Sequence, residues 1–462
     1  MNRFHPVRAQ ASDGVARPDN ELALLDQAFF DGHRVTGQNE VMQAVWIYEQ
    51  AIDSDGLKRV HHNLGYGLLG RRIERSPLPF GRHRWVADRG PSDIDIVDRA
   101  RPRAEVSDWA DERSQLPIDP EKGPGWHLGV LPLTDGSTAV SLVVSHYLID
   151  GVGLFIELFD ANLDNTRDLR YPPPRSRTRL RAVVQDARQT ARDVPEAVRA
   201  LVAATKMARG LRRVSARSPA PAIVALRGGD DDEVVVVPWV SIYINLDVWD
   251  ARAKALGGTS NTLAAGLAAK FGERMGRRRA DDGTVTLQLL ISERAEGDTR
   301  AVAVSFPRVV VDPTRVTTDL RGARAAVKQA LKTQRETPDE SSHVASLTPF
   351  TPTRALKRLV GGALTDPDRP VLCSHLGDTP PGARGIDGTD AEYVTARGIG
   401  QHLTRRWLER SGGQMILQSA RFPDTISITV QAYQPGTENT KPALRELAAQ
   451  TLAEFGLTGK IE

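Results

Sequence analysis

The chain has 462 residues, of which 40% are hydrophobic and 26% are charged, so it is long enough for two or three globular domains. Its formal net charge of +3 gives no reason to expect a nucleic-acid partner. A single cysteine, Cys373, excludes an internal disulfide and a cysteine-rich metal site. With no apolar signal segment near residue 1 and no apolar run of membrane-spanning length, we expect a cytoplasmic protein.

The first part of the chain is predicted to alternate helices and strands. Residues 22–30 have apolar side chains at helical spacing, and residues 41–48 predict a strand. Asp53 or Ser54 is a suitable N-cap for the helix that follows. Residues 76–124 are rich in proline, arginine, aspartate and glycine, and they predict a long irregular connection.

A predicted β-hairpin leads into the most informative stretch of the sequence. Residues 125–133 and 138–145 are apolar, and the Asp-Gly pair between them is a hairpin signal. His146 directly follows the second strand, and Asp150 and Gly151 come shortly after it. These residues form an H-x-x-x-D-G pattern at the open end of a hairpin, where a side chain can be held firmly and still face a cleft.

The residue types in this pattern suit acyl transfer. An imidazole such as that of His146 can remove a proton from an alcohol or amine at neutral pH. Asp150 can either contact His146 or turn away and fix the loop through an arginine. Gly151 lets the backbone turn and leaves room for a ligand. The alternative is purely structural, with His146 closing a turn and Asp150 capping the next helix.

Two other kinds of chemistry find no support in the sequence. There is no G-x-S-x-G segment for a serine hydrolase. The remaining histidines are too scattered to complete a metal site, so we expect no metal.

The middle of the chain, residues 176–232, is predicted to hold basic amphipathic helices and a linker. Residues 180–211 carry an apolar stripe with arginine and lysine on the other face, and the stretch from Asp193 to Glu196 predicts a second helix start. Such a helix can lie on a membrane surface. We favour packing across the two halves instead, because the apolar face lacks tryptophan and phenylalanine. Residues 215–232 have the composition of a linker.

The rest of the chain repeats an order of strands, helix and strands. We therefore expect an α+β fold of two similar units, residues 19–175 and 233–462, separated by residues 176–232. The predicted strands are 233–246, 284–292, 301–311, 370–376, 415–419 and 426–433, and the predicted helices are 260–275, 320–331 and a terminal helix from 444 to 455.

On the H-x-x-x-D-G pattern and its position, the sequence resembles the chloramphenicol-acetyltransferase-like superfamily. This group includes peptide-synthetase condensation domains, bacterial wax-ester synthase/diacylglycerol acyltransferases and polyketide-associated acyltransferases. The resemblance covers nearly the whole chain, and it implies that His146 is the catalytic base. Ser145 stands where a first, supporting histidine often stands in the family.

Three further segments carry the resemblance. The segment 290–294 resembles the family strand that ends in an arginine, which implies that Arg294 pairs with Asp150. The segment 260–265 resembles the helix start that opens the second half, which implies a place beside the tunnel for Asn261. The segment 371–377 resembles the family's Ser-Asn-x-Gly segment, with a histidine in place of the asparagine, and it implies two tunnel-lining residues, Ser374 and His375.

The resemblance implies a pseudo-dimer with a central tunnel and His146 midway along it. The implied activity moves an acyl group from a CoA or phosphopantetheine thioester to a hydroxyl or amine, in lipid or secondary-metabolite biosynthesis, with no tightly bound cofactor. An acyl or peptidyl carrier protein is a further implied partner. Two alternatives stay open: a stand-alone condensation enzyme that joins carrier-bound substrates, and a non-catalytic docking module, suggested by Ser145 and His375.

Overall fold

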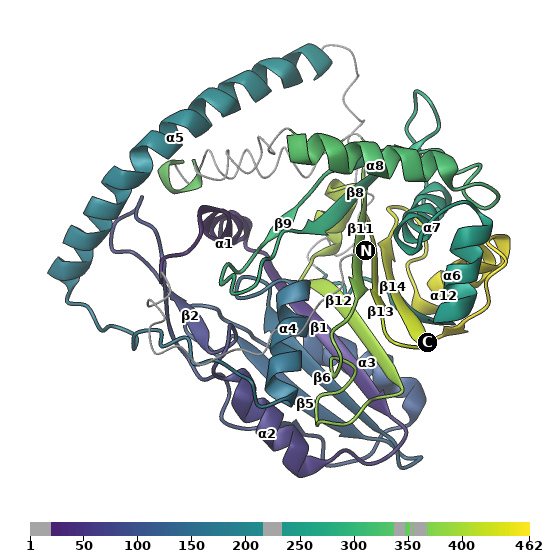
Figure 1. Cartoon of the computed structure of the whole chain (residues 1–462), viewed down its shortest axis with the longest axis horizontal. Coiled ribbons are helices and arrows are strands. Elements are labelled where there is room, and N and C mark those ends of the chain that lie inside the picture. Colours follow the sequence, from purple (N-terminus) through teal and green to yellow (C-terminus); the bar gives the residue numbers. More distant parts are fainter. Residues whose placement is uncertain (1–19, 216–232, 337–346, 352–353, 355–365, 367) are drawn as a thin grey trace.

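The computed structural model describes residues 20–215, 233–336, 347–351, 354, 366 and 368–462. Two β-sheets form the body of the molecule, and helices cover them (Figure 1). The linker expected from the sequence lies almost entirely outside the described residues. A small third sheet pairs β2 (Arg71–Glu74) with β3 (Arg84–Ala87), next to the first helix, α1 (Leu24–Thr36).

The first sheet has the strand order β12-β1-β6-β5-β4. The predicted hairpin is confirmed, since β5 and β6 are antiparallel and Leu131 faces Ala139 across the pair. Helices α2 and α4 cover one face, and α3 packs on the other. The bounds are β1 Asn39–Tyr48, α2 Ser54–Leu64, β4 Asp95–Ile96, α3 Val106–Ser114, β5 Trp126–Pro132, β6 Thr138–Ser145, α4 Gly151–Asn162 and β12 Tyr393–Gln401.

The second sheet has the strand order β10-β8-β11-β13-β14-β7-β15, and β9 adds to β8. Its apolar face packs against helices α6, α7, α8 and α12, which form the largest core of the molecule. The bounds are β7 Trp239–Asn245, α6 Leu246–Ala255, α7 Ser260–Arg274, β8 Val285–Ser292, β9 Val304–Ser305, β10 Arg308–Val311, α8 Arg321–Glu336, β11 Val371–Asp378, α11 Arg405–Arg410, β13 Gln414–Arg421, β14 Thr425–Tyr433, α12 Lys441–Glu454 and β15 Lys460–Ile461.

Strand β12 crosses from the second half of the chain into the first sheet. It pairs with β1 in antiparallel register, with Ala44 opposite Ala396. It also touches the second sheet, because Gly398 N–H donates to Gln418 Oε1 at 2.8 Å and Gln431 Nε2 donates to the Gly398 carbonyl at 2.9 Å. The expected boundary at residue 233 therefore does not coincide with the division between the sheets, and β12 holds the two sheets together.

Two expectations about helices were wrong. Residues 76–124 are not all irregular, because α3 lies among them and buries Trp109 to 1% exposure against the first sheet. The helix restart at Asp193 is also absent, since α5 (Arg179–Ser215) runs through Pro195 without a break. Pro195 cannot bond to the carbonyl of Ala191, but both residues are exposed, so water can take the missing place.

Candidate active site

His146 stands in the loop between β6 and α4. The loop is firmly anchored: His146 N–H donates to the Glu40 carbonyl at 3.0 Å, while the Leu148 and Ile149 side chains are completely buried. The imidazole is half-buried, and its enclosed Nδ1 atom has no hydrogen-bond partner among the residues that the structure describes. Nε2 is therefore the ring nitrogen that a molecule in the adjacent cavity can reach.

Asp150 is the N-cap of α4, and its carboxylate is fully occupied. Oδ1 accepts from Gly153 N–H at 2.8 Å and from Arg294 Nε at 3.2 Å. Oδ2 accepts from Arg294 Nη2 at 2.7 Å and from Ala303 N–H at 2.9 Å. No hydrogen bond joins Asp150 to His146 in the described part of the chain. Of the two alternatives that the sequence left open, the contacts are those of loop fixation through an arginine.

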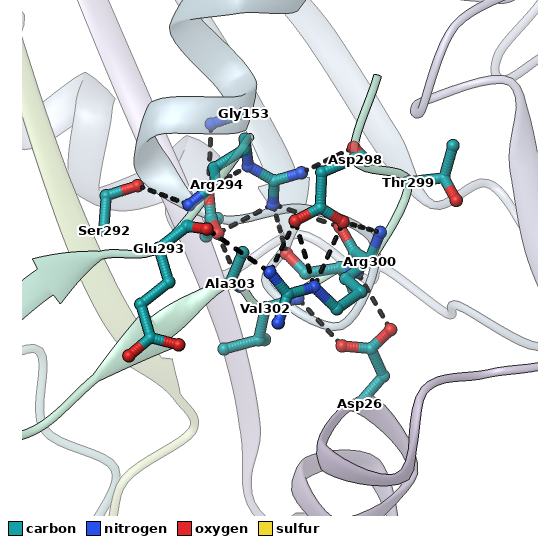
Figure 2. A network of polar contacts seen from close by, with 12 residues as sticks. Asp26, Gly153, Ser292, Glu293, Arg294, Asp298, Thr299, Arg300, Val302 and Ala303 are labelled. Carbon is teal, nitrogen blue, oxygen red and sulfur yellow. Dashed lines mark hydrogen bonds and ion pairs between the residues drawn. The ribbon is translucent and has the colours of Figure 1, made fainter. Parts of the chain in front are cut away.

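Arg294 binds Asp150 as the resemblance implied, and it holds the loop after β8 as well. Its guanidinium donates to the carbonyls of Asp298, Arg300 and Ala301 at 3.0–3.1 Å. Figure 2 shows the arginine surrounded by these groups, with Asp26 of α1 on the far side of the same loop. Asp26 accepts from the backbone N–H groups of Ala301 and Val302, both at 2.9 Å.

The charges in this network are out of contact with water. Asp26 is 2% exposed, and burial raises the pKa of its carboxyl above the ordinary value. The Asp150 and Arg294 side chains are 2% and 3% exposed. Such a buried pair is held in one geometry, because separating it leaves an uncompensated charge in a low-dielectric site. The network therefore fixes the loop that carries His146 to the segment after β8.

A cavity of about 110 Å³ lies between the two sheets. His146, Asp150 and Gly151 form part of its wall on the side of the first sheet, and Ser374 and His375 of β11 form part of the other side. The structure thus brings together most of the residues that the sequence singled out. Much of the remaining wall is apolar and includes Met42, Leu154, Leu290, Leu376, Val394 and Phe422.

His375 is held by two serines. Its Nδ1 lies 2.8 Å from Ser419 Oγ and its Nε2 lies 3.4 Å from Ser260 Oγ. Ser260 Oγ also accepts from Trp249 Nε1 at 2.8 Å. Because an indole can only donate, the Ser260 hydroxyl proton is free to point at Nε2 when the imidazole proton is on Nδ1.

With the imidazole proton on Nδ1, the Ser419 hydroxyl becomes a hydrogen-bond donor. His375 donates to its oxygen, so the Ser419 hydroxyl proton can point to the Ser374 carbonyl, 3.5 Å away, or to a molecule in the cavity. The ring stays neutral, since burial and then the nearby Arg421 guanidinium lower the pKa of His375 to about 4. The wall opposite His146 therefore offers a hydrogen-bond donor.

Two predicted site residues lie outside the cavity wall. Ser145 is completely buried at the end of β6, and its Oγ has no hydrogen-bond partner in the described part of the chain. Successive strand residues point to opposite sides, so Ser145 points away when His146 faces the cavity. Asn261, expected beside the tunnel, is not part of the wall of this cavity. It is half-buried in the first turn of α7, and Ser260, one residue earlier, makes the contact with His375.

The sequence reasoning missed the polar floor of the cavity. Gln418, Ser419, Ser427 and Thr429 line it from β13 and β14. A signal was present, because β14 alternates strictly between aliphatic and polar residues. The aliphatic residues of β14 pack on the helices. Ser427 and Thr429, on the opposite face of the strand, are 4% and 2% exposed, so that polar face is buried as well. A buried polar face on a central strand indicates a site.

Other reactive groups are unsuited to catalysis. Cys373 is 2% exposed, and burial raises the pKa of its thiol to about 12, so it stays protonated and inert at neutral pH. In the ranges that the structure describes, no cluster of histidine, cysteine and carboxylate side chains could hold a metal ion.

Two sheets joined by an exchanged strand, with a histidine loop at the cavity between them, define the two-subdomain chloramphenicol-acetyltransferase-like fold that the sequence resemblance predicted. No protein-family model matches the sequence, and no curated protein matches it.

Solved structures match the chain over almost its whole length. The first condensation domain of the calcium-dependent antibiotic synthetase has 16% identity and a TM-score of 0.56, covering 95% of this chain and 96% of its own. Trichothecene 15-O-acetyltransferase from Fusarium sporotrichioides has 13% identity and a TM-score of 0.56, with 94% of each chain covered. Wax ester synthase/diacylglycerol acyltransferase from Marinobacter aquaeolei VT8 has 15% identity and a TM-score of 0.52, covering 94% and 98%. At these identities the likeness concerns the fold.

Proposed function

We propose that the protein is an acyltransferase that moves an acyl group from a thioester to a hydroxyl or amine. The observation that carries this proposal is the position of His146. Its ring borders a cavity between the two sheets, and Nε2 is the nitrogen that faces a reactant. The loop that carries the ring is tied to the second half by Asp150 and Arg294.

In the proposed reaction His146 Nε2 accepts the proton of the acceptor hydroxyl or amine as that atom attacks the thioester carbonyl. The carbonyl oxygen becomes an oxyanion, and the Ser419 hydroxyl is a suitable donor to it from the opposite wall. When the tetrahedral intermediate collapses, the carbon–sulfur bond breaks and the imidazolium returns its proton to the leaving thiolate. A positioned base contributes about 10²–10⁴ in rate, and an oxyanion donor contributes a comparable factor.

The cavity wall supports an acyl substrate. Apolar side chains from both sheets, such as Met42, Leu290 and Phe422, line the space beside His146. Besides His146 and the floor, the polar part of the wall consists of Gln43, Asp150, Ser292, Ser374, His375 and Arg397. This distribution suits a substrate with an apolar chain and one reacting carbonyl.

The donor is proposed to be acyl-CoA or an acyl group on the phosphopantetheine of a carrier protein. The second candidate is a condensation enzyme that joins two carrier-bound substrates, and the structural likeness to a peptide-synthetase condensation domain favours considering it. Both candidates use the same base and the same cavity. They differ in the acceptor, which is a free small molecule in the first and a carrier-bound amine in the second.

An acceptor-dependence assay tests the proposal. The purified protein is given acyl-CoA or acyl-loaded carrier protein, each with and without a pool of alcohols and amines. Thiol release and product mass are then followed. Acyl-ester or acyl-amide product that needs both substrates supports transfer, and the better donor separates the two candidates. Thiol release that is independent of every acceptor contradicts transfer, and no release with any donor favours a docking module.

A further inference from the structure

Helix α5 lies at the outer edge of the molecule, apart from both sheets (Figure 1). It has 37 residues, so at about 1.5 Å per residue it is roughly 55 Å long. Nothing in the proposed acyl transfer uses it. The side chains described below belong to its first part, residues 179–199.

One face of α5 packs on the body of the protein through its acidic residues. Asp186 is 1% exposed and forms ion pairs with Arg177 at 2.8 Å and Arg84 at 3.3 Å. Asp193, two turns further on, pairs with Arg82 at 3.7 Å. The sequence favoured packing across the two halves, but Arg82 and Arg84, which these ion pairs reach, both belong to the first half. The negative charges of Asp186 and Asp193 are therefore turned inward and paired.

A different face of α5 exposes an apolar stripe. Leu180, Val184, Val194 and Val198 have exposed fractions of 76%, 40%, 46% and 56%. At 3.6 residues per turn these positions align along one side of the helix, and the exposed Ala187 and Ala191 fill the space between them. An exposed and continuous apolar stripe of this length indicates a binding surface.

A row of arginines runs beside the apolar stripe. Arg181, Arg188, Arg192 and Arg199 are all exposed and follow helical spacing. None of them forms an ion pair within the described residues. Among the described side chains of this part of α5, a row of arginines thus runs along one side and a row of apolar residues along the next.

We propose that this surface of α5 binds an anionic lipid bilayer. A bilayer offers acidic headgroups above an apolar interior, so one surface satisfies both rows. An acidic protein would match the arginines but not a straight apolar stripe of this length. The helix would lie in the membrane plane, because within the described ranges every helix is too short or too polar to traverse a bilayer.

Cosedimentation of the full chain with vesicles tests this. Vesicles of phosphatidylcholine alone are compared with vesicles that also contain phosphatidylglycerol. The protein is expected to bind only the anionic vesicles, and less at high salt because screening weakens the attraction. Substituting Arg188, Arg192 and Arg199 by Gln should weaken binding on the order of a hundredfold, since each charge near the surface contributes about fivefold. The double variant Val194→Glu with Val198→Glu should abolish binding.

Two matched variants control for the change of side chain. Val248→Glu alters an exposed valine on α6, and Arg445→Gln alters an exposed arginine on α12. Both are expected to bind like the unmodified protein. Circular dichroism checks that each variant is folded, and acyl transfer checks that the cavity is intact.

Three results would overturn the proposal. The first is no binding to anionic vesicles at low salt. The second is a loss of vesicle binding in the control variants as large as the loss in the α5 variants. The third is a surface covered by another protein chain. Sedimentation velocity detects a second copy if the α5 variants dissociate an oligomer. Soluble polyglutamate tests for a purely acidic partner. Such a partner is indicated if polyglutamate binds as tightly as the vesicles and if the valine substitutions do not weaken its binding.

Discussion

The guanidinium of Arg294 lies 2.7 Å from the carboxylate of Asp150, and the two side chains are 3% and 2% exposed. The two residues come from different halves of the chain and meet directly behind the loop of His146. Backbone N–H groups of Gly153 and Ala303 complete the hydrogen bonds of the carboxylate. The position of the proposed base thus depends on a buried pair that does not itself touch the reacting atoms.

Replacing Arg294 by Met should destabilise the protein strongly. The change leaves the Asp150 carboxylate buried without its counter-ion, which costs about 3–5 kcal/mol of unfolding free energy. The midpoint of urea denaturation measures the loss. Arg321→Met is the matched control, because Arg321 pairs with Asp319 at 2.8 Å on the surface, and we expect its midpoint to stay unchanged. Similar losses in the two variants would show that the buried pair stabilises the protein no more than a surface pair does.

Replacing two glycines of α4 by alanine should affect stability to different extents. A Cβ on Gly153 would lie 2.8 Å from Ile149 Cγ1 and 3.1 Å from Arg294 Cζ, so Gly153→Ala must displace Ile149 and press on the arginine. We expect a loss of about 1–3 kcal/mol from this overpacking. A Cβ on Gly151 would meet only Leu376 at 3.4 Å, an ordinary contact, so Gly151→Ala should leave the thermal midpoint unchanged. Equal midpoints for both variants would contradict the close packing behind His146.

Acid should destabilise the protein partly through His375. Burial and then Arg421 lower the pKa of this imidazole to about 4 in the folded state, whereas the unfolded value is about 6.5. The unfolded chain therefore binds a proton first, and stability is lost as the pH falls from about 6.5 to about 4. Between about pH 7 and about pH 5 the loss from this residue is about 2 kcal/mol.

The variant His375→Asn isolates that contribution. Asparagine does not titrate, so the difference in unfolding free energy between the two pH values should shrink by the same amount. His127 remains as a second source of pH-dependent stability in this variant, because burial and then Arg113 lower its pKa to about 4 as well. An undiminished pH dependence in His375→Asn would contradict a buried neutral ring at this position.

The sequence predicted those parts of the site that depend on short spacing or on a family pattern. The hairpin before His146 follows from an Asp-Gly turn between two apolar runs, and it is present in the structure. The pairing of Arg294 with Asp150 came from the family resemblance, because the two residues are 144 positions apart and no local signal links them. The ion pair is present in the structure as well.

Strand β12 could not be found by local reasoning. Gly398 and Gly400 lower its strand propensity, and its partner β1 lies far away in the sequence. It becomes a strand because it pairs with the edge of β1 that would otherwise be free, and because two glutamines of the second sheet bind its backbone. The Ser419–His375–Ser260 chain was missed for a similar reason, because strands β11 and β13 and helix α7 meet only in the fold.

The central claim is that His146 is the general base, and single-turnover acyl transfer by His146→Ala tests it most directly. Two further properties are measured in each variant. They are the binding of a non-transferable thioether analogue of the donor and the midpoint of urea denaturation. His62→Ala, which alters an exposed histidine of α2, is the control. We predict a rate lower by about 10²–10⁴ for His146→Ala, with analogue binding and the midpoint unchanged. A rate within a few-fold of the unmodified protein would contradict the account.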